Sequence, residues 1–343
     1  MNRCEHNIME PPSNKCAQLQ GLLAALVLLM ETAGCASRRP SPVLVERSTA
    51  AIQESESSAG LSLRLVTYNI WGLPSWMTGA RSGRYPKIAR ELERLDPDFI
   101  LLQEAWTAKA RKAAPGNRVW SLARAAGQHT FFQQSGLMTL SRFPIVGGRF
   151  FPFSRSAFPD RFVNKGVLKV TVQLPTRELL NVWNVHLQDG GSPEIRLSQV
   201  RELIARVQGA DDGQVADVVG GDFNCTPGSP WYAELSNALG ASLQQLGGGA
   251  PFVTWDGLSA KSAGETLDYI FVKTRTSFQS AQGSLRVAFT APSLDQRLSD
   301  HLGIEALVSL LPARRLARAQ RPLNASSSLP ALTTAEHTYA AGN

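Results

Sequence analysis

The feature that most constrains the fold is a series of short apolar runs between residues 61 and 311, each ended by glycine or polar residues. The stretch Val218–Asn224 is the clearest case, because two glycines, an aspartate and an asparagine end its apolar run. Alternation along a strand places Asp222 and Asn224 on the same side, at the carboxyl end where open α/β sheets build their sites. Gly, Asp and Asn are also ordinary turn residues, so this stretch alone leaves a plain strand-end turn open.

Two longer segments have the apolar spacing of amphipathic helices, and the other runs have the length of strands. Residues 85–95 place Ile88, Leu92 and Leu95 on one face, and residues 192–207 begin with a Ser-Pro-Glu helix start. Many connections are hairpin-like, and the sequence contains neither a GxGxxG motif nor a Walker loop. The pattern therefore predicts one strand-rich α/β domain over residues 61–311. We expect its strands at residues 63–70, 99–102, 136–140, 166–172, 179–185, 216–219, 267–272 and 302–308.

Both ends of the chain lack this pattern. The apolar run Leu22–Met30 is too short to span a bilayer but has the size of a signal-peptide core, and Ala33-Gly34-Cys35 follows it. Residues 1–35 resemble a bacterial lipoprotein signal, in which the cysteine is lipidated; a plain secretory signal or a short anchor is the alternative. We therefore expect an exported protein, anchored to a membrane or else secreted or periplasmic. Residues 36–60 read as a flexible tether and residues 312–343 as a disordered tail.

Cysteine content and charge limit the chemistry of the predicted domain. Cys225 is its one cysteine, so no internal disulfide is possible, and we expect a small core residue there rather than a nucleophile. The whole chain has a formal charge of +7, while residues 61–311 contain 26 Lys and Arg against 21 Asp and Glu, a net charge of +5. This modest charge suits an anionic substrate such as a phosphodiester, without the dense clustering expected for strong non-specific DNA binding.

Polar residues follow the predicted strands in six short blocks, which are TYNI, LLQEAW, NVHLQ, GGDFN, LDYIFV and LSDH. In this order, over residues 63–308, the blocks resemble the endonuclease/exonuclease/phosphatase superfamily. Its members are similar to pancreatic deoxyribonuclease, neutral sphingomyelinases and inositol-polyphosphate 5-phosphatases. The resemblance implies a four-layer α/β/β/α sandwich of two packed mixed sheets. It also implies a metal-dependent phosphoric diester hydrolase that uses Mg²⁺, or another divalent ion such as Mn²⁺.

Further blocks resemble the bacterial sphingomyelinase branch. Asn164-Lys165-Gly166 looks like that group's NKG block, and HLQ at residues 186–188 and TWD at residues 254–256 are similar to its later blocks. This resemblance implies hydrolysis of sphingomyelin to ceramide and phosphocholine at a phospholipid membrane, with no specific nucleic acid and no obligate protein partner. Secreted sphingomyelinases often carry an aromatic hairpin before the final SDH, whereas residues 289–294 are short and contain one aromatic residue. An inositol-phosphate phosphatase or a nuclease therefore stays open as the alternative.

Phosphoryl transfer needs a hard cation, an activated water and donors for the charge on the phosphoryl oxygens. Glu104 is the first candidate for a metal ligand, because a carboxylate at the end of the run 99–102 has no role in an apolar core. Asn69 is expected to offer an oxygen to the same ion or its waters, since Mg²⁺ keeps most of its waters. Asp300 is expected to contact metal-bound waters or loop amides.

The remaining block residues are candidates for the catalytic steps. His301 is expected to be the general base, because the unperturbed pKa of imidazole lies near neutrality. The resemblance implies that Asp268 orients His301 and that His186 donates to a phosphate oxygen near the leaving group. Asp222 either positions the water or is itself the base, and Asn224 is expected to hold a phosphoryl oxygen. The sequence leaves open which of Asp222 and His301 takes the proton.

Lys165 and Asn164 are expected to bind the substrate phosphate, because the glycine that follows lets the backbone approach closely. An ordinary solvated lysine is the alternative. Three tryptophans in the loops after the first two site strands either line a lipid-facing rim or are partly buried: Trp71, Trp76 and Trp106. A surface adhesion module with a decayed site would have lost at least one catalytic block residue, and none is missing.

Overall fold

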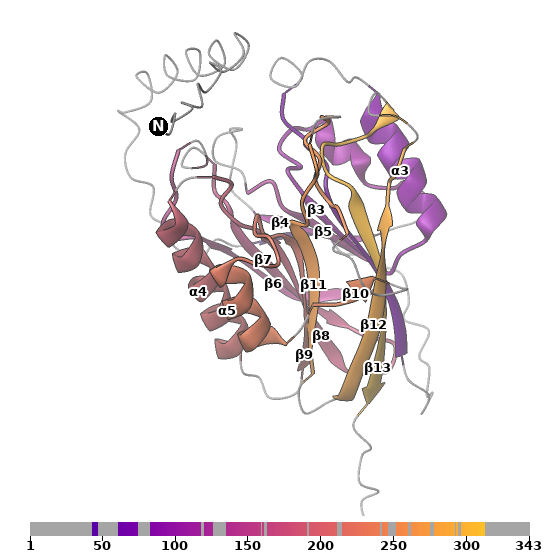
Figure 1. The fold of residues 1–343 in the computed structure, drawn as a ribbon. Coiled ribbons are helices and arrows are strands. Elements are labelled where there is room, and N and C mark those ends of the chain that lie inside the picture. Colours follow the sequence, from indigo (N-terminus) through magenta and orange to yellow (C-terminus); the bar gives the residue numbers. More distant parts are fainter. Residues whose placement is uncertain are drawn as a thin grey trace, which may run out of the picture.

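The computed structural model describes residues 43–46, 61–74, 83–117, 120–125, 135–158, 160, 163–190, 192–210, 215–240, 242–245, 252–259, 262–274, 278–291, 293 and 296–312. Two β-sheets are packed face to face, with helices on both outer surfaces (Figure 1). The predicted signal at residues 1–35 and the tail beyond residue 312 lie outside the described residues, and Pro312 itself ends the last strand. In the described part, no helix has the length and apolar character needed to cross a membrane.

One sheet has eight strands and the other has five. The eight-stranded sheet has the order β1 (Val43–Glu46), β4 (Ser121–Ala125), β5 (Met138–Ser141), β3 (Phe99–Gln103), β2 (Leu61–Asn69), β13 (Gly303–Pro312), β12 (Phe278–Ala288) and β10 (Gln244–Gln245). The five-stranded sheet has the order β11 (Asp268–Lys273), β9 (Val215–Asp222), β8 (Leu179–His186), β7 (Gly166–Gln173) and β6 (Ile145–Pro152). Both sheets are mixed, because β2 with β3 and β8 with β9 are parallel pairs among antiparallel ones.

The helices complete a four-layer α/β/β/α sandwich, as the sequence resemblance implies. Helices α4 (Pro193–Gly209) and α5 (Pro230–Leu239) cover the outer face of the five-stranded sheet, and α3 (Arg84–Leu95) covers that of the eight-stranded sheet (Figure 1). A short 3₁₀ helix, η1, spans Ala110–Ala113. The predicted helix start at residues 192–194 is confirmed, since Ser192 is the N-cap and a proline follows it.

Strand alternation builds the three apolar layers. In β2, Leu63 and Leu65 face the other sheet, while Val66 and Tyr68 pack with Ile88 of α3. In β8 and β9 the same alternation sends one set of apolar side chains into the interior between the sheets and the other set toward α4 and α5. The interior side of β2, β8 and β9 carries a polar block residue at the carboxyl end of each strand, and the antiparallel β11 carries one at its start.

The structure differs from the sequence prediction at residues 43–46, within the expected flexible tether. These residues form β1, which pairs antiparallel with β4 from Val43 opposite Ala125 to Glu46 opposite Leu122. The segment Val43–Glu46 has only four residues, which is too short for its β-branched residues to show a clear strand pattern. Its partner strand β4 has small residues on one face, so β4 also lacks an apolar alternation. Strands β6, β10 and β12 and helix α5 were also not predicted.

Candidate active site

The block residues converge because they occupy interior positions at the ends of neighbouring strands. Asn69 ends β2, His186 ends β8, Asp222 ends β9 and Asp268 begins the antiparallel β11. In the five-stranded sheet, Asp222 lies directly opposite both His186 and Asp268 in the strand register. All four side chains are buried. The site therefore lies between the two sheets, at one end of their strands, and not on an open surface.

Asn69 connects the carboxylates of the two sheets. Its Nδ2 donates hydrogen bonds to Glu104 Oε1 at 3.1 Å and to Asp222 Oδ2 at 2.9 Å. Its Oδ1 accepts a hydrogen bond from the Trp71 backbone N–H at 3.0 Å. This bond uses one of the two lone pairs of Asn69 Oδ1, so the expectation that this oxygen contacts a metal ion or its waters stays a prediction. The left-handed backbone of Trp71, with φ of 47°, turns its N–H back toward Asn69.

Glu104 provides the best ligand for a cation. Its Oε2 is buried and has no hydrogen-bond partner among the described residues, which leaves one carboxylate oxygen available. Burial, and then the negative charge of Asp300, raise the pKa of Glu104 to about 7. A buried carboxylate beside a second acid fits a divalent cation with oxygen ligands, such as Mg²⁺. Glu104 has a left-handed backbone (φ 57°), a strained conformation of the kind that clusters at functional sites.

His301 and Asp268 form a hydrogen-bonded pair beside Asp222. His301 Nδ1 lies 2.9 Å from Asp268 Oδ2, and His301 Nε2 lies 3.6 Å from Asp222 Oδ2. Burial opposes the charge of His301, but the carboxylates of Asp268 and Asp222 outweigh it and hold its pKa well above the usual range. Asp268 is itself oriented by Thr254, whose Oγ1 accepts the Asp268 N–H at 3.1 Å. The predicted orienting role of Asp268 agrees with this geometry.

The atoms of Asp222, Asp268 and His301 also have metal-ligand spacing, because one ligand atom of each lies within 4.8 Å of the others. Within this group the Nδ1 atom of His301 is hydrogen bonded to Asp268, and the Nε2 atom faces Asp222. Burial raises the pKa of Asp222 to about 6, partly offset by His301. Asp222 and His301 face each other at 3.6 Å, so the charge of each group changes the pKa of the other.

His186 and Asn224 complete the contacts around Asp222. His186 Nε2 lies 3.6 Å from Asp222 Oδ2, and the Asn224 N–H donates to Asp222 Oδ1 at 3.0 Å. Burial, and then the nearby cations of Lys165 and His301, hold the pKa of His186 well below its usual range, so its imidazole is neutral. A neutral imidazole still has one N–H, which is compatible with the predicted donor role of His186.

Lys165 is buried, which excludes the alternative of an ordinary solvated lysine. Its Nζ forms an ion pair with Asp160 Oδ2 at 2.7 Å and donates to the Leu187 carbonyl at 3.1 Å. Burial alone would lower the pKa of Lys165, but Asp160 outweighs it and raises the pKa. The Leu187 carbonyl also accepts a hydrogen bond from Asn224 Nδ2 at 3.0 Å, so Lys165 lies beside the other site residues, and its charge acts on Glu104 and Asp222. Asn164 precedes it and is half-buried.

Two of the polar strand-end residues serve the interior instead of the site. Gln103 Nε2 donates to Asn184 Oδ1 at 2.8 Å, and Asn184 Nδ2 donates to the carbonyls of Leu102 and Met138. This pair links the two sheets through their otherwise apolar interface. Trp106 is also buried and lies against Gly136, so it does not line a lipid-facing rim; Trp71 is half-buried, and Trp76 lies outside the described residues.

Sequence reasoning assigned no role to several residues that hold the site together. Ser299 Oγ donates to the Asn69 carbonyl at 2.8 Å, and the segment at residues 254–256 bonds to residues 300 and 302. Ser299 and Thr254 stand inside blocks quoted for the family resemblance, which was their one available signal. Asp160 and Arg84 stand outside every block, and the sequence carries no signal for them.

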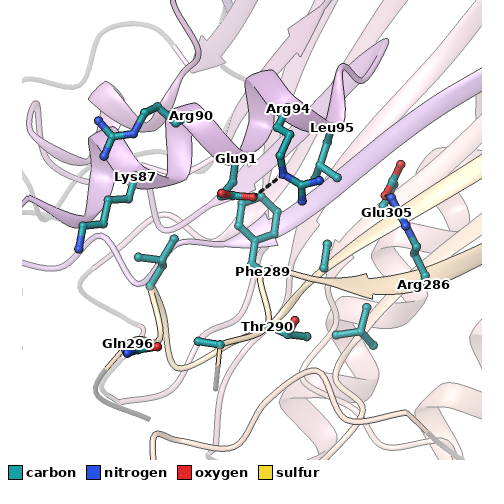
Figure 2. A pocket seen from close by; sticks show the side chains of 14 residues that line it. Lys87, Arg90, Glu91, Arg94, Leu95, Arg286, Phe289, Thr290, Gln296 and Glu305 are labelled. Carbon is teal, nitrogen blue, oxygen red and sulfur yellow. Dashed lines mark hydrogen bonds and ion pairs between the residues drawn. The ribbon is translucent and has the colours of Figure 1, made fainter. Parts of the chain in front are cut away.

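A separate cavity of about 550 Å³ lies between α3 and strands β12 and β13 (Figure 2). Its walls include the exposed cations Lys87, Arg90 and Arg94 of α3. None of the predicted site residues lines it. Glu91 forms an ion pair with Arg94 in this wall, so the cavity has a mixed charged surface of its own.

Known proteins with similar sequences include two that are named for sphingolipid hydrolysis. An inositol phosphosphingolipids phospholipase C of Schizosaccharomyces pombe is 24% identical over 296 residues, covering 72% of this chain and 68% of that protein. A putative neutral sphingomyelinase of Drosophila melanogaster is 26% identical over 187 residues, covering 51% of this chain and 42% of that protein. The chain thus spans about two fifths of the length of the second relative.

Three solved structures share the fold. The sphingomyelinase C of Streptomyces griseocarneus has a TM-score of 0.54 at 20% identity, covering 72% of this chain and 99% of its own. A beta toxin of Staphylococcus aureus with bound magnesium ions has a TM-score of 0.55 at 17% identity, with coverages of 72% and 99%. TDP2 of D. rerio, complexed with a single-strand DNA product, has a TM-score of 0.59 at 15% identity, with coverages of 72% and 98%.

A family profile matches residues 66–301, which include all the site residues described above. The match extends from within β2 to the His301 block, and strands β1 and β13 of the eight-stranded sheet lie outside it. This chain belongs to the endonuclease/exonuclease/phosphatase family.

Proposed function

We propose that this protein is a Mg²⁺-dependent phosphodiesterase that hydrolyses the head-group phosphodiester of a phospholipid, with sphingomyelin as substrate and ceramide and phosphocholine as products. The observation that carries the proposal is the arrangement around Asp222. Asn69, His186, His301 and Asn224 all contact or face this one buried carboxylate, beside the available oxygen of Glu104.

Glu104 and Asp300 are the residues that would hold the ion, and Asn69 would keep Glu104 oriented. A divalent cation in this position supplies charge neutralisation for the phosphoryl oxygens. The cation also suits the electrostatics of the protein, because burial and the neighbouring Asp300 both oppose the charge on Glu104. Lys165 adds a positive charge that acts on both Glu104 and Asp222.

Hydrolysis requires a water to attack phosphorus, the bond from phosphorus to the lipid oxygen to break, and one proton to move from the water to the leaving oxygen. The pair of Asp222 and His301 accepts the proton of the water, with Asp268 holding the imidazole in orientation. The neutral His186 and the Asn224 side chain are donors for the phosphoryl and leaving oxygens. General acid–base assistance of this kind contributes roughly 10²–10⁴-fold.

The lipid substrate is supported by the names of the relatives, which are a sphingolipid phospholipase C and a putative sphingomyelinase. The NKG, HLQ and TWD blocks and the modest charge of residues 61–311 support the same branch. Cleavage of DNA is the second candidate, because the TDP2 structure with a DNA product shares the fold. An inositol-phosphate phosphatase is the third, from the resemblance of the sequence blocks.

A substrate panel tests the proposal. The purified protein would be assayed with sphingomyelin vesicles, phosphatidylcholine vesicles, soluble inositol phosphates and plasmid DNA, each in Mg²⁺ and in EDTA. We expect phosphocholine release from sphingomyelin in Mg²⁺, loss of this activity in EDTA, and its return when Mg²⁺ is restored. Efficient cleavage of DNA or inositol phosphates with sphingomyelin left intact would contradict the lipid substrate, and full activity in EDTA would contradict the metal.

A further inference from the structure

Arg84, the first residue of α3, is a buried cation outside every predicted site block. Its side chain lies within the protein with 5% of its surface exposed. A guanidinium taken out of water needs partners for its N–H groups, because an unpaired buried charge is strongly destabilising. Its described acceptors are all neutral: the carbonyls of Ile70, Trp71 and Leu298 and the hydroxyl of Tyr85.

The three carbonyl acceptors belong to the two segments that carry Asn69 and Asp300. Ile70 and Trp71 directly follow Asn69, and Leu298 directly precedes the Ser299–His301 segment. Arg84 Nη1 donates to both Ile70 and Leu298, at 2.8 Å to the latter, so one nitrogen joins chain segments that are far apart in sequence. A second link runs parallel to it, because Ser299 Oγ donates to the Asn69 carbonyl.

The Trp71 contact connects Arg84 to the orientation of the Asn69 amide. Arg84 Nη2 donates to the Trp71 carbonyl, and the guanidinium lies 5.6 Å from the centre of the Trp71 ring. Trp71 has a left-handed backbone, and its N–H donates to Asn69 Oδ1. That bond leaves the Asn69 Nδ2 facing Glu104 and Asp222. Arg84 therefore stabilises the turn on which the amide orientation depends.

We propose that Arg84 is a positioning residue of the active site. It holds the loop after β2 against the segment before His301, and so sets the distance between Asn69 with Glu104 on one side and Asp300 with His301 on the other. The role rests on the proposed metal-dependent hydrolysis, although the contacts themselves do not. A lysine retains the charge but has one nitrogen, which cannot span the three backbone carbonyls.

The test compares Arg84→Met and Arg84→Lys with Arg90→Met, a control on the same helix. Arg90 is exposed and lies in the wall of the separate cavity (Figure 2). Three quantities would be measured for each protein: kcat and KM, the Mg²⁺ concentration for half-maximal activity, and the rise in Tm that Mg²⁺ produces. Loss of contacts that orient metal ligands typically costs about 10–100-fold in metal affinity or activity.

We expect both Arg84 variants to lose about 10–100-fold in kcat with KM changed less, and to need more Mg²⁺ for a given rise in Tm. Arg90→Met should behave as wild type.

A folded Arg84→Met with wild-type kcat and an unchanged Mg²⁺ response would overturn the proposal, as would a lower Tm with an unchanged Mg²⁺ response. If Arg84→Met does not fold, Arg84→Lys decides by the same criteria. If the wild type cleaves no phosphodiester, the proposed function fails, while the Mg²⁺-dependent Tm still tests Arg84.

Discussion

Asp222 is the residue on which the candidate site converges. Two groups donate to its oxygens, Asn69 Nδ2 at 2.9 Å and the Asn224 N–H at 3.0 Å, and both histidines face it at 3.6 Å. A carboxylate in such surroundings is kept in one orientation, which is what proton transfer to or from a bound water requires. Asp268 orients His301 beside this group, and the charge of Lys165 acts on it.

Replacing Asp222 by asparagine tests whether its carboxylate takes part in proton transfer. Asp222→Asn keeps the shape of the side chain but loses the ability to accept a proton, so kcat should fall at least about 10²-fold with the fold retained. Asp96→Asn is the matched control, since Asp96 is an exposed helix C-cap with a left-handed backbone that asparagine tolerates. Steady-state kinetics in saturating Mg²⁺ give the comparison, and a near-normal rate for Asp222→Asn would refute the role.

The ion-binding role of Glu104 predicts a different signature. Glu104→Gln removes the charge but keeps the volume, so the protein should lose most of its turnover and most of the Tm increase produced by Mg²⁺. Glu91→Gln is the control, because Glu91 forms a surface ion pair with Arg94 and such pairs contribute little. Differential scanning calorimetry with and without Mg²⁺ measures the effect. An unchanged Mg²⁺ response in Glu104→Gln would place the ion elsewhere.

Cys225 stands next to Asn224 but has the properties of a core residue. It is 1% exposed, and burial raises the pKa of its thiol to about 12, so the thiolate that reacts with electrophiles is not formed at neutral pH. Iodoacetamide should leave Cys225 unmodified in the native protein and alkylate it after unfolding in guanidinium. Mass spectrometry of the peptide containing residue 225 reads the result, and fast native labelling would contradict this assignment.

At the scale of elements, Gly221 shows how closely β8 and β9 approach beneath the site. Its φ is 147°, and a Cβ at this position would lie 2.1 Å from the Val185 carbonyl oxygen. Gly221→Ala should therefore push the strands apart and destabilise the fold by about 1–3 kcal/mol, in the range of overpacked cores. Gly228→Ala is the control, because a Cβ there meets no atom within 4 Å. Urea unfolding measures both, and equal stability would show that the strands adjust freely.

The elements that were predicted are those whose apolar pattern matches their burial. The segment 99–102 is an unbroken apolar run and forms the fully buried β3, and the spacing of Ile88, Leu92 and Leu95 forms α3. Strand β12 was not predicted because Gln282, Gly283 and Ser284 interrupt its apolar residues. It is held by long antiparallel pairing with β13, which is a tertiary interaction that local sequence does not encode.

The site residues also divide into those that the local sequence predicts and those that tertiary contacts position. Residues at the ends of buried strands could be predicted, since strand parity fixes the side to which Asn69, Asp222 and Asp268 point. Contacts made by loops could not. The Asp160 partner of Lys165 and the atom that Asn69 turns toward Glu104 depend on loop conformations such as the left-handed Trp71. Local propensity carries little information on such positions, because the surrounding structure imposes them.

At the scale of the whole molecule, we propose that the protein is exported and anchored through a lipid on Cys35. The apolar run Leu22–Met30 followed by Ala33-Gly34-Cys35 supports this. Wild-type protein should partition with membranes, and Cys35→Ala should become soluble or stay unprocessed. Cell fractionation and the intact mass of the purified protein measure the two effects. The same fractionation and mass for both proteins would refute lipid attachment.

The pairing of β1 with β4 then limits where such an enzyme can work. Because Val43 is fixed at the edge of the eight-stranded sheet, a lipid on Cys35 is joined to the folded body by residues 36–42 instead of the whole stretch up to residue 60. Even fully extended, seven residues reach only about 25 Å, at about 3.3–3.6 Å per residue. The catalytic domain would therefore move in two dimensions along the leaflet that holds its anchor. With the proposed lipid substrate in the same leaflet, enzyme and substrate would meet by lateral diffusion.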